Sequence, residues 1–321
     1  MASEILRCSS PRQEDEVERA MSTFQKSLRT RSVGLLIADC SSWLVPPVCL
    51  LCVLLADRAA SADPPPSPMG LLFSESFEDA DLLKRGWYDG RHFTISAEKP
   101  NSGTGALEYR WEEADTVPAN SSGIRRLFAP SNVVYLRCYI RLSKNWGWTG
   151  RGYHPHLMHF MTTENGRYHG PAASHLTVYI EPWNGRLRLA AQDIQNKEKP
   201  YGLTQGPLRG GYNGQMFDSA KTLFVDDKWH CIEAMFQLNT LDAQSGRANA
   251  DGVVRGWFDG ELVIDRTDVV LRSPDFPDMQ FNQFLLTPYF GPGLLPHAQT
   301  LWIDDLAVGT KRIGPRADET K

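Results

Sequence analysis

From residue 70 onward, apolar and polar residues alternate in short runs separated by turn-forming residues. A period of two places every second side chain on one face of a β-strand, and these runs are rich in β-branched and aromatic residues. Sustained helical periodicity is missing from the sequence, and only Asp79–Lys84 suits a short helix. The predicted strands are Val133–Leu142, Leu157–Met161, Leu176–Ile180, Arg186–Ala191, His230–Leu238, Val253–Phe258 and Leu301–Val308.

Two dipeptides between predicted strands indicate tight hairpins. In Asn184-Gly185 and Asp259-Gly260, both residues tolerate the positive φ that the preferred two-residue turn requires. Many strands joined by such turns, without helices, form either two packed sheets or a barrel. We therefore predict an all-β protein, built as an antiparallel β-sandwich with one concave and one convex sheet. An extended polymer can lie in the groove of the concave sheet.

The first 62 residues have the order of a secretory signal. A basic stretch precedes the short apolar run Leu44–Ala56, and Ala60–Ala62 offers small residues for cleavage. Met21 is an alternative start, because the residues just before it are acidic. The apolar run is shorter than the roughly 20 residues of a spanning helix, so we predict export to the cell surface, the periplasm or the medium. An uncleaved membrane anchor is the alternative.

The rest of the chain contains one predicted domain. Residues 63–69 form a proline-rich spacer, residues 70–314 the β-sandwich domain and residues 315–321 a polar tail. A net charge of −4 is too small to attract nucleic acid over the whole surface, so no nucleic-acid partner is expected. Cys138 and Cys231, the cysteines outside the predicted signal, occupy opposite faces of their strands, which predicts two free thiols.

Four segments of this domain carry a family resemblance: FSESFEDADLLKRGWYDG, NSGTGALEYRW, the block that contains DGVVRGWFDGELV, and TLWIDDLAVG. Together they resemble the concanavalin A-like lectin and glucanase superfamily, particularly its polysaccharide lyase-like members. The resemblance covers about residues 71–314 and implies a jelly-roll sandwich with a polysaccharide as ligand. Its motifs specify the fold better than the chemistry: the WFDGELV hairpin, for example, is shared by glucanases, lyases and laminin G-like modules.

The resemblance also implies a structural calcium ion that joins the two ends of the domain. In related sandwiches, an opening FE motif and a closing DD motif supply carboxylates, and a turn like Ser102-Gly103 supplies carbonyl oxygens. Calcium takes six to eight such hard oxygen ligands. The predicted ligands are Glu75, Glu78, Asp304 and Asp305. The alternative is that these are solvated carboxylates at strand ends.

Two further groups of residues suggest chemistry on a sugar acid. In YLRCYIRL, Arg137, Tyr139 and Arg141 share one face of a predicted strand. Guanidinium groups bind carboxylates through two parallel hydrogen bonds. In HPHLMHF, His156 and His159 lie at and within the next strand, and imidazole transfers protons near neutral pH. A zinc site on these histidines is a weaker interpretation, because no matching carboxylate is evident.

These residue types are those of a polysaccharide β-elimination. The reaction needs a group that neutralises the uronate carboxylate, a base for the C5 proton and an acid for the leaving oxygen. The candidate to neutralise the carboxylate is Arg137 or Arg141, the candidate base is His156 or His159, and the candidate acid is Tyr139 or Tyr289. Gln192 and Gln283 are candidates to bind the sugar through their side-chain amides.

The motifs leave the activity open. Jelly-roll alginate lyases carry an Arg-rich strand, a QxH strand and a C-terminal Tyr motif, whereas this chain has HPH in place of QxH. A retaining glucanase needs E-x-D-x-x-E on one strand, which the sequence lacks. We therefore predict a carbohydrate-active protein that binds, and cleaves by β-elimination, an acidic glycan. The alternative is a non-catalytic lectin-like or adhesion module.

Overall fold

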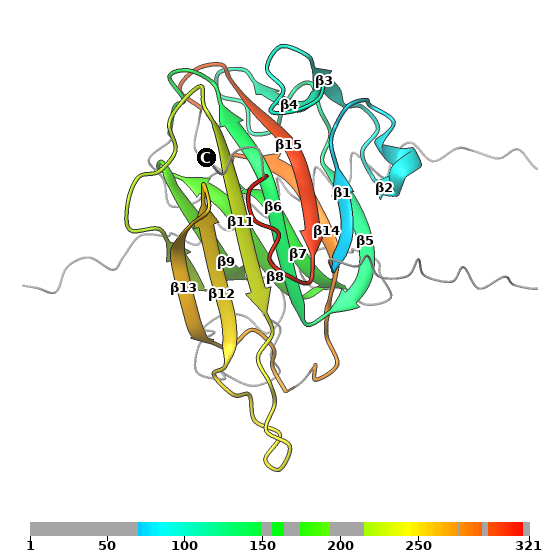
Figure 1. Ribbon diagram of the computed structural model, residues 1–321, viewed down its shortest axis with the longest axis vertical. Helices are drawn as coiled ribbons and strands as arrows, with labels where there is room; N and C mark the ends of the chain where they lie inside the picture. The colour runs from blue at the N-terminus through cyan, green and yellow to red at the C-terminus, as the bar shows by residue number, and fades with distance from the viewer. Residues whose placement is uncertain are drawn as a thin grey trace, which may run out of the picture. The chain divides into compact units, whose positions relative to one another are not determined.

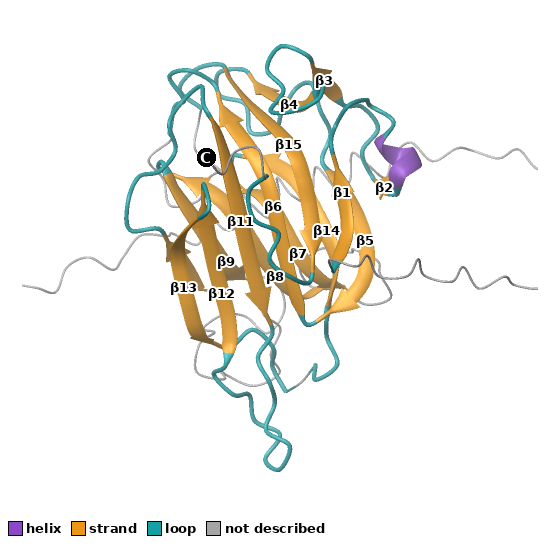
Figure 2. Cartoon of the chain, viewed as in Figure 1, coloured by secondary structure: helices purple, strands orange, loops and turns teal. Residues whose placement is uncertain are grey.

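The computed structural model describes residues 70–148, 156–163, 174–192, 215–274, 276–290 and 295–316. All of them belong to one compact unit, Pro65–Lys321. Within these ranges the chain is almost entirely β-structure, apart from a short 3-10 helix, η1 (Leu82–Arg85), and two antiparallel sheets account for the strands in Figure 2. No helix among the described residues has the length and apolar character needed to cross a membrane.

Sheet A is the eight-stranded sheet, and it faces the viewer in Figure 1. Its strands are, in spatial order, β13 (Glu261–Val269), β12 (Gly252–Phe258), β11 (Trp229–Gln237), β6 (Val133–Leu142), β15 (Gln299–Gly309), β4 (Ala106–Trp111) and β3 (Thr94–Ser96), with β1 (Leu71–Glu75) paired to β15. The first and last strands of the domain are thus hydrogen-bonded neighbours.

Sheet B is the seven-stranded sheet that lies behind sheet A in Figure 1. Its strands are, in spatial order, β10 (Gln215–Asp218), β9 (Arg186–Gln192), β8 (Ser174–Trp183), β7 (His156–Thr163), β14 (Phe281–Tyr289), β5 (Ile124–Ser131) and β2 (Trp87–Tyr88). The consecutive strands β7, β8 and β9 pair as a meander, whereas β14 and β5 join them from distant parts of the chain.

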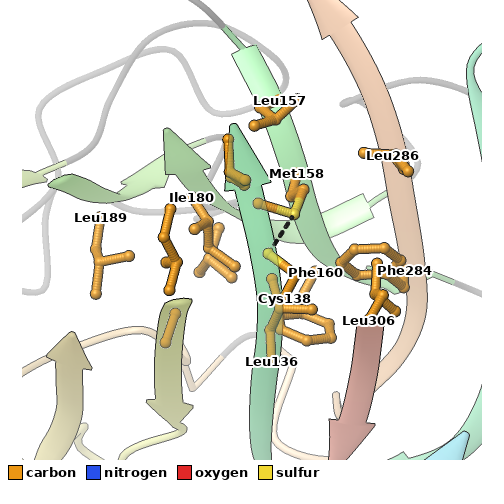
Figure 3. Packing of buried hydrophobic residues seen from close by; sticks show 14 of the residues in the cluster. Leu136, Cys138, Leu157, Met158, Phe160, Ile180, Leu189, Phe284, Leu286 and Leu306 are labelled. Carbon is orange, nitrogen blue, oxygen red and sulfur yellow. Dashed lines mark hydrogen bonds between the residues drawn. The ribbon is translucent and has the colours of Figure 1, made fainter. Parts of the chain in front are cut away.

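The core fills the space between the two sheets, as Figure 3 shows for part of it. Cys138 of β6 and Met158 of β7 meet there, with 3.7 Å between their sulfur atoms. Phe160 of β7 packs edge-on against Phe236 of β11. Cys231 is buried too but lies outside this core cluster, and both cysteines are free, as predicted from the opposite faces of their strands. The predicted antiparallel β-sandwich is confirmed.

The local predictions are confirmed at both hairpins. Asn184 and Gly185 have φ values of 46° and 76°, and Asp259 and Gly260 have values of 49° and 85°. These positive angles give the turn a twist that matches the strands on either side. The predicted short helix is η1, which begins at Leu82 and is a 3-10 helix.

Candidate functional site

The predicted catalytic residues lie on both sheets and do not form one site. Arg137, Tyr139 and Arg141 are on β6 of sheet A. The other candidates are on sheet B: His156 and His159 on β7, Gln283 and Tyr289 on β14, and Gln192 on β9. The predicted convergence of Arg137 and Tyr139 with the histidines is therefore wrong.

The packing of β6 against β7 explains this correction. Cys138 and Met158 point at each other through the core, so each strand directs its alternate side chains outward, away from the other sheet. Arg137 and Tyr139 thus face one side of the molecule, and His159 faces the opposite side. No rotamer change can bridge a packed core between two sheets, which are about 10 Å apart.

The β6 residues instead bind the C-terminal segment and a loop. The Arg316 backbone N–H donates to the Tyr139 hydroxyl at 2.9 Å, and this segment crosses the outside of sheet A in Figure 1. Arg141 donates to Asp227 at 2.7 Å. Hydrogen bonds from Lys99 and then Arg141 lower the pKa of Asp227 to about 2. These contacts give Tyr139 and Arg141 structural roles.

The outer face of sheet B brings together the residues that remain. Arg125 of β5 pairs in register with Leu285 of β14, which pairs with His159 of β7. His159 in turn pairs with Tyr179 of β8. Directly paired residues of antiparallel strands project from the same face. Arg125, His159 and Tyr179 therefore form one row across four strands.

His159 is the buried basic group of this row. Its side chain is 4% exposed, and its ring lies edge-on to Tyr179 with 4.4 Å between centroids. Burial, and next the neighbouring His156, lower the pKa of His159 well below its usual 6.5. The imidazole is therefore neutral at neutral pH and able to accept a proton. Its Nδ1 has no hydrogen-bond partner among the described residues.

The next row supplies amide and hydroxyl groups. Gln283 is fully buried, and its Nε2 donates to the Tyr88 hydroxyl at 2.5 Å. Its Oε1 has no hydrogen-bond partner in the described part of the chain, and neither has Oγ1 of the buried Thr177. Gln192 continues this row, because it pairs in register with Thr177. Buried polar atoms without partners are costly, so their presence here fits a surface built for a polar ligand.

A second cluster lies at the His156 end of β7. His156 Nδ1 is 2.5 Å from Oε1 of Glu181, and both side chains are buried. The His156 ring stacks on Tyr289 with a 10° interplanar angle and lies 4.8 Å from the ring of Tyr179. Burial raises the pKa of Tyr289, which keeps its phenol protonated. The two clusters share Tyr179, whose ring contacts both histidines.

Three residues of this face were missed by the sequence analysis. Arg125 pairs with Asp89 through Nη1, and it stands in the segment GIRRLF rather than in the arginine-rich strand chosen from the sequence. Tyr179 and Glu181 had a detectable signal in LTVYIE, because the apolar alternate residues Leu176, Val178 and Ile180 leave them on the opposite face. Alternation in that strand was sufficient to propose them.

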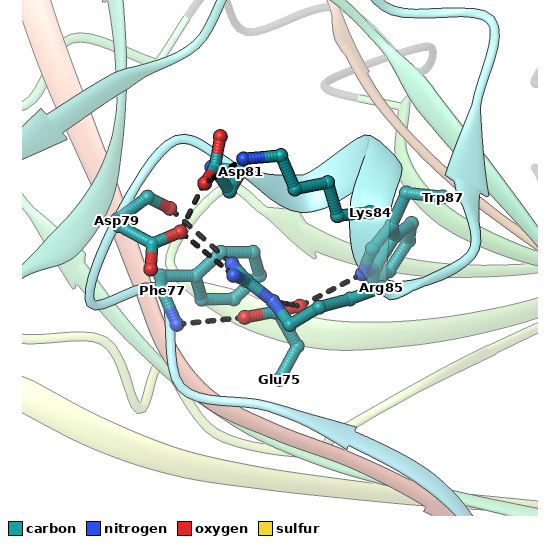
Figure 4. A network of polar contacts seen from close by, with 7 residues as sticks. All are labelled: Glu75, Phe77, Asp79, Asp81, Lys84, Arg85 and Trp87. Carbon is teal, nitrogen blue, oxygen red and sulfur yellow. Dashed lines mark hydrogen bonds and ion pairs between the residues drawn. The ribbon is translucent and has the colours of Figure 1, made fainter.

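The four predicted calcium ligands all accept hydrogen bonds within the protein. Both carboxylate oxygens of Glu75 are occupied: Oε1 accepts from the Phe77 backbone at 3.1 Å, and Oε2 accepts from Arg85 and from the Trp87 indole, each at 2.9 Å. Figure 4 shows this network. Glu75 is therefore an anchor for the chain around η1, and its arrangement does not fit a metal ligand.

The remaining three predicted ligands accept hydrogen bonds from residues 101–104, which include the Ser102-Gly103 turn. Asp304 accepts from the backbone N–H groups of Asn101 and Ser102, at 2.8 and 3.1 Å, and Asp305 accepts from their side chains. Glu78 accepts from Thr104. These carboxylates face hydrogen-bond donors, and no group of three acidic, histidine or cysteine side chains among the described residues is arranged for a metal. The calcium ion stays a prediction.

Comparison with known proteins bears on the fold. Neither a family model nor a curated protein matches the sequence. The structure is similar to the alginate lyase vAL-1 from Chlorella virus, with a TM-score of 0.54 and 15% identity over 75% of this chain and 100% of that one. It is equally similar to the marine PL-14 alginate lyase from Aplysia kurodai, with a TM-score of 0.54 and 15% identity over 75% and 99%. Identity at this level shows a shared β-sandwich fold.

Proposed function

We propose that this protein binds an acidic polysaccharide on the outer face of sheet B and cleaves it by β-elimination. The observation that carries the proposal is the row that aligns a neutral, buried His159 with Arg125, two strands away, and has the partnerless carbonyl oxygen of Gln283 in the next row. A proton acceptor and a cation are the groups that a uronate at the cleavage point requires, and an amide carbonyl can accept from a sugar hydroxyl. The sandwich fold shared with two alginate lyases supports the same class of reaction.

The roles follow from the chemistry of each group. Arg125 would bind the carboxylate on C5 and stabilise the negative charge that develops there, and the carbonyl oxygen of Gln283 would accept a hydrogen bond from a sugar hydroxyl. His159 would take the C5 proton, the C5–H electrons would form the C4=C5 double bond, and the C4–O4 bond would break. Arg125 thus takes the role first assigned to Arg137 or Arg141. The proton for O4 would come from the cluster of His156, Tyr179 and Tyr289.

Export and a structural calcium ion belong to the same proposal. The predicted signal lies outside the described residues, so its support is the sequence pattern alone. Assignment to the concanavalin A-like superfamily rests likewise on the sequence motifs, since no family model matches.

The test is the ultraviolet absorbance of unsaturated chain ends after the full chain is incubated with polymannuronate, polyguluronate, polyglucuronate and a neutral glucan. We expect absorbance to rise with at least one uronate polymer and not with the glucan. His159→Gln should abolish the rise, whereas His230→Gln should preserve it, because His230 is an equally buried histidine of sheet A. No rise with any uronate, together with retention on an immobilised polysaccharide, would leave the non-catalytic binding module as the function.

A further inference from the structure

We propose that His156, positioned by Glu181, is the general acid that protonates the leaving O4, so that the two histidines of β7 divide the acid and base roles. This inference rests on the proposed lyase function. It assigns to one residue the proton that the cluster of His156, Tyr179 and Tyr289 has to supply.

The contact between Glu181 and His156 is the first step of the argument. Oε1 and Nδ1 are 2.5 Å apart, and the side chains are 3% and 7% exposed. A buried carboxylate is costly unless an opposite charge lies next to it. Protonated His156 would offer that charge at the distance observed. The contact is at Nδ1, so the other ring nitrogen, Nε2, faces away from the carboxylate and can give a proton to the substrate.

Further charged and titratable groups lie around His156 on the neighbouring strands. Arg188 of β9 pairs in register with Glu181, but its guanidinium donates to Asp218 at 2.6 and 2.8 Å. Tyr179 from β8 and Tyr289 from β14 contact the ring of His156 by their faces and edges.

The spacing of the histidines suits a reaction at two adjacent carbons. Their ring centroids are 5.9 Å apart, so an acid on one and a base on the other can flank C5–H and O4. After burial, the neighbouring His156 also lowers the pKa of His159, and this keeps the imidazole of the proposed base neutral. Two like groups with different environments commonly take opposite roles in this way.

The proton balance is complete without a further reactant. His159 receives the C5 proton, the C4–O4 bond breaks as the C4=C5 bond forms, and His156 gives its Nε2 proton to O4. After the products leave, His159 loses a proton to water and His156 gains one. The site is then restored.

The test compares kcat on a uronate polymer for the wild-type protein, His156→Gln, Glu181→Gln and Asp218→Asn. A second set of assays uses a uronide with a 4-nitrophenoxy group at C4, which leaves without a proton from the protein. On the polymer, His156→Gln and Glu181→Gln should each lower kcat by about 100-fold or more, since a general acid contributes roughly 10²–10⁴ in rate. On the nitrophenoxy substrate both variants should keep most of the wild-type kcat. Asp218→Asn removes a carboxylate from the same face and should leave both rates in place.

An equal loss on the polymer and on the nitrophenoxy substrate in His156→Gln would overturn the acid role, because such a loss does not depend on the proton that the leaving group needs. An equal loss on both substrates in Glu181→Gln alone would overturn the positioning role of Glu181. If the wild-type protein cleaves neither uronate substrate, the proposed function itself fails.

Discussion

Arg125 and Arg137 are both outward-pointing arginines on strands of the sandwich, yet their surroundings differ. Arg125 is held by Asp89 and pairs in register into the row of His159. The guanidinium of Arg137 lies over the ring of Tyr139, 5.5 Å from its centroid. The hydroxyl of Tyr139 accepts a hydrogen bond from the C-terminal segment. Residue type alone does not separate a binding arginine from a structural one. The neighbours contributed by other strands make the difference.

A matched pair of substitutions tests this distinction. Arg125→Gln should lower kcat/KM on a uronate polymer by about 10- to 100-fold, since a charge-assisted hydrogen bond to a carboxylate contributes roughly 1.5–3 kcal/mol. Arg137→Gln should leave kcat/KM within about twofold, because sites on opposite sheets act independently. Steady-state kinetics with a melting-temperature check measures both. The reverse ranking would move the binding face to sheet A.

At the scale of elements, β1 and η1 depend on one buried carboxylate. Glu75, at the end of β1, receives hydrogen bonds from the backbone just after it, from Arg85 of η1 and from Trp87 of β2. These contacts attach β1 of sheet A to β2, an edge strand of sheet B. A polar anchor at this place fixes the path of the chain between the layers.

Glu75→Gln should therefore lower the free energy of unfolding by about 2–3 kcal/mol, less than for a fully buried pair because Arg85 is partly exposed. Glu98→Gln is the control, since Glu98 is an exposed carboxylate, and it should cost roughly 0.5 kcal/mol or less. Denaturant unfolding measures both values. Equal costs for the two variants would contradict the anchor role.

At the scale of the whole molecule, the two ends of the domain are fastened together. β1 pairs with β15, and Asp304 of β15 holds the turn at Asn101 and Ser102. Burial raises the pKa of Asp304 from 3.8 to about 6. The folded protein therefore retains a proton that the unfolded chain has released, so this carboxyl stabilises the fold in acid and loses that contribution as the pH rises through about 6.

Asp304→Asn should remove this pH dependence. The difference in melting temperature between wild type and variant should shrink by roughly a few degrees as the pH rises from 3.8 to about 6. Asp227→Asn is the control, because the pKa of Asp227 is lowered to about 2 and its contribution changes only in stronger acid. A constant difference for Asp304→Asn would contradict the prediction. Repeating the melts with calcium and with chelator tests the predicted metal: a lower melting temperature in chelator supports it.

The sequence by itself determined the features that depend on near neighbours. Alternation predicted β6 with its observed bounds and placed Cys138 and Cys231 on opposite faces. The Asn-Gly and Asp-Gly pairs predicted both hairpins, because the positive φ of those turns is a property of the residues themselves. Apolar runs of strand length without helical period predicted the sandwich class, since such strands bury their apolar faces by packing two sheets together.

Only the tertiary structure decided which strands share a sheet, and hence which polar residues share a face. β6 and β7 follow each other along the chain, yet β6 pairs with β11 and β15, and β7 pairs with β8 and β14. Those pairings are contacts between distant parts of the chain, and a strand's own alternation is the same in either sheet. For this reason the sequence places His156 and His159 on one strand, whereas only the pairing of strands shows that Arg125, and not Arg137, lies in the row of His159.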